Sequence, residues 1–242
     1  MEQIVRLVGC IGVDGARFIE EHIDPQFKAL THLYHHIEDR NAFPRLVVAN
    51  ALVSYQLSGR GEEWWWEFAH WFSRREVKDI YEAYSKFLPK SRTNRRLVHA
   101  KLKRLERAKG FLMEMDVDRY YKDMLSLRDA LAGVLNTRKD AKTVVFAVKM
   151  FGYAMRIATG EFVPYPMEVP IPVDSRIERV TKRFGRVDPI HFWNTVAGRT
   201  GVPPLHIDSI LWPVLGGNKE VKREIVRSFG RVGEELVALL SP

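Results

Sequence analysis

Three side chains on one predicted helical face could carry chemistry in this chain. A helical period over residues 140–158 places Lys142, Phe146 and Lys149 together, at positions i, i+4 and i+7. A lysine amine attacks an electrophilic carbon only when it is unprotonated, and a dry pocket or a second cation lowers its pKa towards that state. Lys142 is therefore a candidate nucleophile, with Lys149 as the second cation. The alternative interpretation is a solvated basic stripe on a surface helix.

A carboxylate follows a stretch that cannot be helical. Residues 160–172 contain four prolines, and Asp174 comes where the next helix is expected to begin. The dipole of that helix favours the ionised form of a carboxylate at its start, which suits a group that stabilises positive charge. Asp is also a favoured N-cap residue, so Asp174 taken by itself is an ordinary cap.

The elements that must position these side chains are helices. Apolar residues recur with helical period along most of the chain, and almost no segment alternates as a strand does. The sequence predicts an all-α fold of two helical lobes that flank a cleft. Helices over about 120–135 and 140–158, joined by the short polar turn 136–139, predict a helix-hairpin-helix element. Further helices are expected over 25–37, 44–57, 62–72, 76–88, 189–200, 203–215, 219–229 and 232–240.

The proline-rich segment is also the expected crossing between the lobes. We expect residues 44–165 to form the helical lobe that carries the helix-hairpin-helix. Residues 1–43 and 166–242 are then expected to form the second helical lobe, with the active site between the two.

Composition limits the partners and cofactors of the chain. The formal net charge of +8 favours a polyanionic partner, although charge alone does not identify nucleic acid. Cys10 is the only cysteine, so one chain assembles no disulfide and no cysteine-ligated zinc or iron–sulfur cluster. We expect no metal and no cofactor. Charged residues interrupt the apolar runs, which predicts neither a signal peptide nor a membrane partner, and we expect a cytoplasmic monomer.

The order of these features resembles a known superfamily. A hairpin, a lysine shortly after it and a Pro-Val-Asp at the next helix start are typical of the helix-hairpin-helix DNA glycosylases. Six ordered segments resemble more closely the archaeal 8-oxoguanine DNA glycosylase family: residues 24–26, 52–55, 59–63, 142–146, 171–174 and 203–208.

The resemblance implies a bifunctional glycosylase and lyase of base excision repair. In that family pattern Lys142 is the nucleophile that attacks C1′ of the damaged nucleoside, and Asp174 is the essential carboxylate. The Schiff base that results acidifies the C2′ proton, so the strand is then cut by β-elimination. The implied partner is damaged DNA, double- or single-stranded, from which 8-oxoguanine is flipped, and such an enzyme is expected to associate with the nucleoid.

The resemblance also implies a pocket for the flipped base. Trp65 and Trp212 are the expected stacking faces, with Phe146 against the ring edge, although any one Trp is also explained as core packing. Asp208, at i, i+4 from Trp212, can accept from the N1 and N2 hydrogens of guanine. The implied base-binding set is Gln26, Trp65, Phe146, Lys149, Asp208 and Trp212.

The contacts with the DNA backbone depart from the superfamily pattern. The hairpin usually carries glycines, whose exposed amides bind phosphate, but the turn 136–139 contains none. We therefore expect Arg138 and Lys139 to bind phosphate through their side chains.

Gln56 could fill the gap left in the duplex or be a surface polar residue. The basic stretch 90–109 could line the phosphate backbone or be a solvated face.

Two other functions remain open from the sequence. One is a non-catalytic helix-hairpin-helix DNA-binding protein, which would bind DNA without cutting it. The other is a glycosylase for a different damaged base, which would keep the fold and change the pocket.

Overall fold

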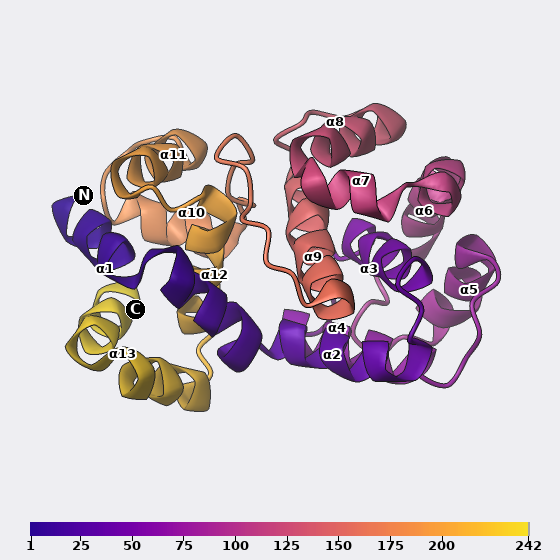
Figure 1. Ribbon diagram of the computed structural model, residues 1–242, viewed down its shortest axis with the longest axis horizontal. Helices are drawn as coiled ribbons and strands as arrows, with labels where there is room; N and C mark the ends of the chain where they lie inside the picture. The colour runs from indigo at the N-terminus through magenta and orange to yellow at the C-terminus, as the bar shows by residue number, and fades with distance from the viewer. Residues whose placement is uncertain (242) are drawn as a thin grey trace. The chain divides into compact units, whose positions relative to one another are not determined.

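Helices make up the regular structure of this protein. The computed structural model describes residues 1–241, and no strand occurs among them (Figure 1). The prediction of an all-α fold is confirmed. The chain divides into two compact units, one formed by Met1–Asp24 with Pro164–Pro242 and the other by Pro25–Val163.

The unit boundaries differ from the expected lobes at one end. The unit Pro25–Val163 starts well before residue 44, because α2 (Pro25–Ile37) packs against α4 (Gly61–Phe72) and α9 (Lys142–Thr159). At the other end, the division between Val163 and Pro164 lies inside the proline-rich segment, where no helix forms.

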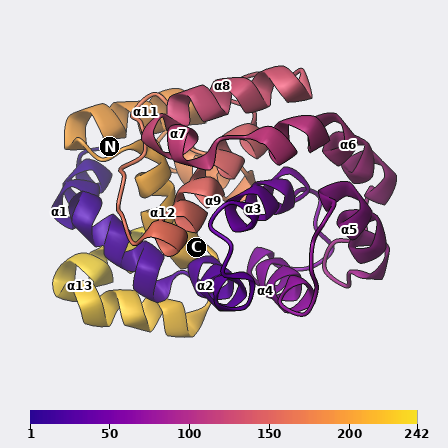
Figure 2. The same cartoon turned by 45° about the vertical axis from the view of Figure 1, so that its right-hand side comes forward.

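The core of Pro25–Val163 forms around two buried helices. Helix α3 (Ala42–Leu52) is buried from Phe43 onwards except at Arg45, and it packs along α9. Figures 1 and 2 show these two helices side by side. The remaining helices of this unit are α5 (Ile80–Phe87), the 3-10 helix η2 (Leu88–Lys90), α6 (Val98–Glu114), α7 (Val117–Lys122) and α8 (Met124–Leu135).

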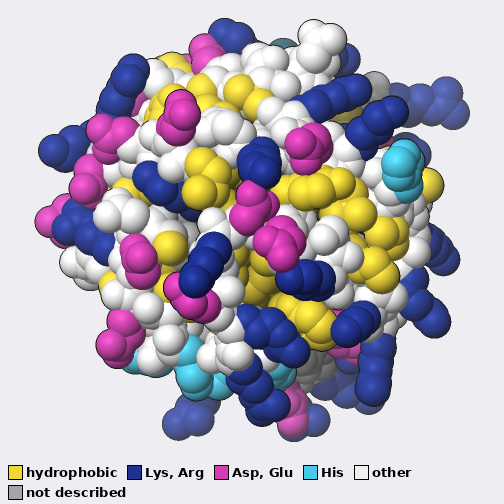
Figure 3. Space-filling model, turned by 90° about the vertical axis from the view of Figure 1, so that its right-hand side faces the viewer, with side chains coloured by type: hydrophobic (Ala, Val, Ile, Leu, Met, Phe, Trp, Pro, Cys, Tyr) yellow, Lys and Arg dark blue, Asp and Glu magenta, His cyan; other side chains and the backbone are white. Residues whose placement is uncertain are grey.

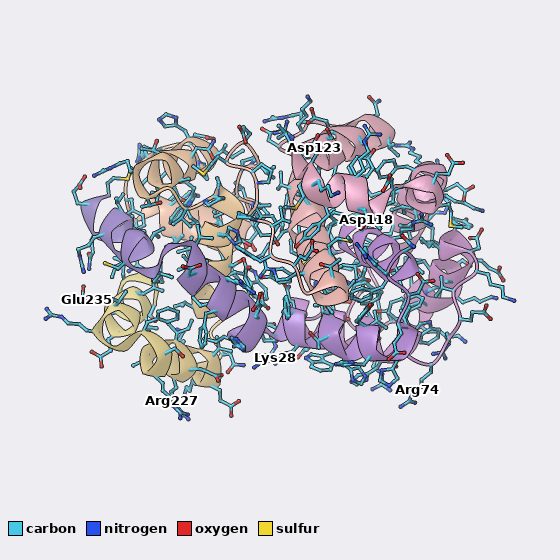
Figure 4. The ribbon with its side chains drawn as sticks, in the orientation of Figure 1. Lys28, Arg74, Asp118, Asp123, Arg227 and Glu235 are labelled. Carbon is cyan, nitrogen blue, oxygen red and sulfur yellow. The ribbon has the colours of Figure 1, made fainter. Side chains whose placement is uncertain are left out.

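The predicted helix-hairpin-helix is formed by α8 and α9. Helix α8 starts later than expected, because the Asp123 side chain accepts a hydrogen bond from the backbone N–H of Ser126 and thereby begins a new helix after α7. Figure 4 labels Asp123 at this junction. After the last helical residue, the left-handed backbone of Asn136 (φ 49°) lets the Thr137 N–H bond the Ala132 carbonyl at 3.0 Å.

The unit of Met1–Asp24 and Pro164–Pro242 has its own apolar core. Large side chains of α1, α11 and α12, among them Leu7, Trp193 and Leu211, are fully buried in it. The Trp193 indole N–H donates to the Thr181 hydroxyl at 2.9 Å, which satisfies its polar atom inside the core. The helices of this unit are α1 (Glu2–Phe18), the π-helix η1 (Ile19–Ile23), α10 (Ser175–Lys182), α11 (Pro189–Thr200), α12 (Pro204–Leu215) and α13 (Lys219–Leu240).

Two of these helices bend at a glycine. Gly12 in α1 and Gly230 in α13 have non-helical backbone angles with positive φ, which other residues adopt only with strain. The bend at Gly230 falls where the sequence separates two expected helices, 219–229 and 232–240. Within residues 1–241, no helix combines the length and apolarity that crossing a bilayer requires.

Candidate active site

The candidate nucleophile lies at the start of α9. Lys142 is the first residue of that helix, directly after the hairpin, and it is exposed. The apolar core of its own unit begins two residues further on, where Val144 and Val145 are fully buried. An exposed amine is accessible to a bulky nucleotide.

The next two turns of α9 pass from surface to core. Phe146 is half-buried and Lys149 is buried, with only 1% of its surface exposed. The Lys149 ammonium lies 5.6 Å from the centroid of the Tyr153 ring, a cation–π distance. Tyr153 was not among the residues expected from the sequence. It is at i+4 from Lys149, so helical spacing was the signal that could have found it.

Trp65 is the member of the Trp64-Trp65-Trp66 run that meets α9. Its ring centroid lies 6.2 Å from that of Phe146, with the planes inclined at 66°, and Trp65 is 1% exposed. Trp64 instead stacks on Phe87 in the core. Trp66 stacks on His70. Because successive helical residues point about 100° apart, the three indoles face different neighbours, and Trp65 is the one that faces the helix of the candidate nucleophile.

Gln26 belongs to the same part of the unit. It is the second residue of α2 and is 3% exposed. Its neighbour Phe27 meets Tyr153 edge-on at a centroid distance of 5.2 Å, so α2 is held against the part of α9 that carries Lys149. Helices α2, α4 and α9 therefore position four of the expected base-binding residues within one unit.

Asp174 is the N-cap of α10, as expected. Its carboxylate accepts hydrogen bonds from the backbone N–H groups of Arg176 and Ile177, both at 2.9 Å. These bonds hold the carboxylate at the positive end of the dipole of α10. Capping therefore holds the group in place without using all the acceptor capacity of its two oxygens.

The other candidates of this unit lie on α12. Asp208 is 2% exposed, and Trp212, one turn later, is half-buried. The guanidinium carbon of Arg176 lies 5.3 Å from the centroid of the Trp212 ring. Sequence reasoning missed Arg176, since its contact joins two helices that are far apart in the sequence.

A buried ionisable pair supports the start of α12. The Nδ1 atom of His206 lies 2.9 Å from the Glu20 carboxylate, and both side chains are fully buried. The backbone N–H of Tyr165 points to the Nε2 atom of the same ring at 3.4 Å. The His206 ring satisfies both partners when Nδ1–H donates to Glu20 and Nε2 accepts from Tyr165. These contacts connect the proline-rich segment to the helix that carries Asp208.

The two candidate phosphate ligands are exposed on the hairpin. Arg138 pairs with Asp140, and the Lys139 ammonium lies 2.6 Å from Asp129, with 82% and 60% of the two cationic side chains exposed. Hydrogen bonds from Arg138 and Lys139 lower the pKa values of Asp140 and Asp129, respectively. Exposed ion pairs contribute little to stability, so either cation can exchange its partner for a phosphate.

The ten predicted site residues divide between the two units. Lys142 and Asp174, the candidate catalytic pair, belong to different units. Pro25–Val163 also contains Gln26, Trp65, Arg138, Lys139, Phe146 and Lys149, whereas the other unit contains Asp208 and Trp212. Among residues 1–241, no group of three or more His, Cys, Asp or Glu side chains is arranged to hold a metal ion.

Fold and site together define a class. A hairpin between α8 and α9, a lysine on the first turn that follows it and a carboxylate capping α10 form the pattern that is typical of helix-hairpin-helix DNA glycosylases. Residues 5–238 match the AGOG family model, described as N-glycosylase/DNA lyase. The chain belongs to this family, so it is an enzyme that acts on DNA as a glycosylase and a lyase.

Individual relatives agree with this assignment. The chain is similar to the N-glycosylase/DNA lyase of Thermococcus kodakarensis, with 56% identity over 89% of this chain and 84% of the relative. It is 51% identical to that of Methanopyrus kandleri, over 91% and 92% of the two chains. A solved structure from Pyrobaculum aerophilum, an 8-oxoguanine DNA glycosylase complexed with 8-oxoguanosine, superposes with a TM-score of 0.84. That protein is 28% identical, and the match covers 99% of this chain and 94% of the other.

Proposed function

We propose that this enzyme removes 8-oxoguanine from DNA through a Schiff base on Lys142 and then cleaves the strand. The single observation that carries the catalytic assignment is an accessible lysine on the first turn after the hairpin. Support for the substrate comes from the family and from the structural relative that holds 8-oxoguanosine. The enzyme works as a monomer, on the damaged DNA of the nucleoid.

The first chemical step is displacement of the base. The Lys142 amine, once deprotonated, forms a bond to C1′ while the bond from C1′ to N9 breaks, and the base leaves with that electron pair and takes up a proton. Asp174 stabilises the positive charge that develops on the sugar. Because the amine is exposed in the free protein, the bound nucleotide itself must exclude water from it.

The second step follows from the covalent intermediate. Opening of the sugar ring converts the aminal at C1′ into an imine, which is protonated and withdraws electrons from C2′. A proton is then lost from C2′, the electron pair of that C–H bond forms a double bond between C2′ and C3′, and the 3′ oxygen leaves with the electron pair of its bond to C3′. One amine therefore accounts for both base removal and strand cleavage.

The flipped base is bound between aromatic faces. We infer that Trp65 and Trp212 stack on its two faces and that Phe146 meets its edge, since stacking is how extrahelical bases are held. Asp208 accepts from N1–H and N2–H, while Gln26 and Lys149 bind the remaining polar atoms. The side chains of Gln26, Trp65, Lys149 and Asp208 are each at least nine-tenths buried, which fixes their orientation before the base arrives.

Borohydride trapping on a duplex with one 8-oxoguanine tests the proposal. Reduction of the imine should link the wild-type enzyme covalently to the DNA, and Lys142→Gln should abolish this product while leaving DNA affinity largely intact. Lys219→Gln is a matched control, because Lys219 is also an exposed lysine at the first position of a helix. It should trap as the wild type does.

Three outcomes would contradict the assignment. Trapping by Lys142→Gln would move the nucleophile to another amine. DNA binding by the wild type without trapping or cleavage would favour the non-catalytic alternative. Faster excision from a duplex that contains another lesion, such as an alkylated base, would overturn 8-oxoguanine as the substrate.

A further inference from the structure

Three adjoining pockets surround the end of α4 on the surface of Pro25–Val163. Their volumes are about 530, 500 and 460 Å³, and each lies within the range of pockets that bind ligands, about 300–1,000 Å³. Arg75 lines all three, so the pockets adjoin one another, and together we call them the α4 groove. The ten predicted site residues lie outside this groove.

The largest of these pockets has an apolar wall. It lies where α2, α4 and α6 end and where α3 and α5 begin. Its wall contains the aliphatic side chains of Ile37, Leu46, Val77 and Ile80, together with Met113, which is 41% exposed. A methionine adapts its shape to different apolar partners. The wall therefore offers apolar surface to an inserted side chain.

Arginines border this apolar wall. Arg45, Arg74 and Arg75 line the same pocket, and Figure 4 labels Arg74 near the C-terminal end of α2. Nη2 of Arg45 donates to the Met115 carbonyl at 3.0 Å. Nη1 of Arg75 donates to the Trp71 carbonyl at 2.6 Å, and its guanidinium carbon lies 3.9 Å from the centroid of the Trp71 ring. These neutral partners hold two guanidinium groups in place without neutralising their charge.

The carboxylates that line the α4 groove are engaged within the protein. Asp39, Glu67 and Asp79 accept hydrogen bonds from backbone N–H groups at 2.6–3.1 Å. Glu76 and Glu82 lie 3.8 Å and 2.6 Å from lysine ammonium groups. Because these five groups already have partners, the arginines of the largest pocket remain available to an anion from outside. The groove therefore favours a negatively charged partner.

The lining favours a protein partner over a nucleic acid. Unpaired bases bind by stacking on accessible aromatic faces. In this groove Phe72 is 1% exposed, and the Trp71 ring is covered by Arg75. The aliphatic wall of the largest pocket instead suits an apolar side chain that anchors a peptide.

The surface of this part of the unit combines the same two properties. Figure 3 looks from the side of Figure 1 on which α5 and α6 lie, and it shows hydrophobic groups between Lys and Arg side chains. An acidic segment with an apolar residue at its centre is complementary to both, since the apolar residue leaves water while the carboxylates meet arginines.

We propose that the α4 groove binds an acidic segment of another protein. An apolar side chain of that segment fills the pocket beside Met113, and its carboxylates bind Arg45, Arg74 and Arg75. Because the contacts of Arg45 and Arg75 already hold their guanidinium groups, little side-chain freedom is lost on binding. The groove contains none of the chemistry proposed for Lys142, so this inference does not depend on the identity of the excised base.

A panel of short fluorescein-labelled peptides tests the proposal. Each peptide has a central Leu, Met, Phe or Trp between Asp and Glu residues, and fluorescence anisotropy measures its binding to the full chain. At least one of them should bind. Replacing its central residue by Gly, or its acidic residues by Lys, should weaken binding by about tenfold or more, because each change removes one of the two complementary properties. Absence of binding across the panel would overturn the inference.

Two variants locate the binding in the groove. Arg74→Glu reverses an exposed charge, and Val77→Asp places a carboxylate in the apolar wall. Each should weaken binding of the acidic peptide by about tenfold or more, and Arg74→Glu should keep the wild-type unfolding temperature and excision rate. Arg119→Glu, which changes an exposed arginine of α7 outside the groove, is the matched control and should bind the peptide as the wild type does.

Two further results would contradict the proposal. Equal peptide binding by Arg74→Glu and the wild type would place the peptide elsewhere. Displacement of the peptide by a thymidine oligonucleotide, together with weaker binding of that oligonucleotide to Arg74→Glu, would make the groove a nucleic-acid site. Lys142→Gln should bind the peptide as the wild type does, so a failure of excision and a failure of peptide binding are distinguishable.

Discussion

The ring of Phe146 meets the ring of Trp65 edge-on, with the centroids 6.2 Å apart. Such a pair contributes about 0.5–1.5 kcal/mol beyond the area it buries, and here it joins α4 to α9 next to Lys142. We expect Phe146→Ala to weaken binding of 8-oxoguanosine, measured by tryptophan fluorescence, because Trp65 loses its support and the base loses an edge contact.

The control for this variant is Phe111→Ala. Phe111 is likewise half-buried and pairs with Tyr120 at 5.7 Å, and neither of these two residues is a candidate for base binding. Both variants should unfold at lower denaturant concentration, but only Phe146→Ala should bind the nucleoside more weakly. Equal binding by the two would remove Phe146 from the pocket.

Asp174→Asn should separate capping from catalysis. Asn accepts the same two backbone hydrogen bonds and is as good an N-cap as Asp, so the free energy of unfolding should change little. The neutral amide no longer stabilises positive charge on the sugar, so we expect single-turnover excision to fall by about 100-fold or more. Asp188→Asn, which alters the N-cap of α11, should leave excision unchanged. An active Asp174→Asn enzyme would reduce Asp174 to a cap.

Arg176→Ala should expose the stacking face of Trp212. The guanidinium lies over that ring in the free protein, and an arriving base must displace it. Both side chains are half-buried, and a cation–π contact is worth about 0.5–1 kcal/mol at exposed sites and more when it is desolvated, so its removal should strengthen binding of 8-oxoguanosine by at least about two- to fivefold. The nucleoside has no phosphate, so a loss of backbone contacts cannot mask the effect. Weaker nucleoside binding would show that Arg176 helps to hold the base.

The hairpin cations should determine part of the salt dependence of DNA binding. Each phosphate contact contributes about −0.9 to the slope of log K against log[salt]. Arg138→Ala and Lys139→Ala should therefore each make the slope shallower by about one unit. Arg231→Ala removes another exposed, ion-paired arginine, on α13, and should leave the slope unchanged. Unaltered slopes in both hairpin variants would contradict phosphate binding there.

Lys101 should make stability depend on alkaline pH. Burial, followed by the nearby Arg96, lowers its pKa to about 8, while the unfolded chain keeps the ordinary value of about 10.5. Between these values the unfolded state binds more protons, so the free energy of unfolding rises with pH, by at most about 1.4 kcal/mol per pH unit. Below about pH 8 Lys101 is protonated in the folded and the unfolded protein, so the free-energy cost of burying its charge lowers the free energy of unfolding in full.

Lys101→Met lacks this titration and gives the reference. Denaturant unfolding of both proteins across this pH range should show the wild type gaining stability relative to the variant. A constant difference would mean that Lys101 keeps its ordinary pKa in the folded protein.

Local chemistry let the sequence predict much of the scaffold. Pro25 as the first residue of α2, Asp174 as the cap of α10 and the glycine-free turn between α8 and α9 depend on neighbours within a few residues, and the structure has all three. The helix expected to reach residue 57 ends at Leu52. The carbonyl of the next residue, Val53, accepts a hydrogen bond from the Asn94 side chain instead of continuing the helix. That contact joins residues 41 positions apart.

The sequence by itself determined the helices that carry Lys142 and Asp174, since periodicity and capping are local properties, and its resemblance to a known family singled out these two residues as the candidate nucleophile and carboxylate. Only the tertiary structure decided that Lys142 is exposed, that Trp65 and not its neighbours meets Phe146, and that Arg176 covers Trp212. These relationships arise from the packing of distant helices, where shape and burial select one arrangement among many that the same local pattern permits.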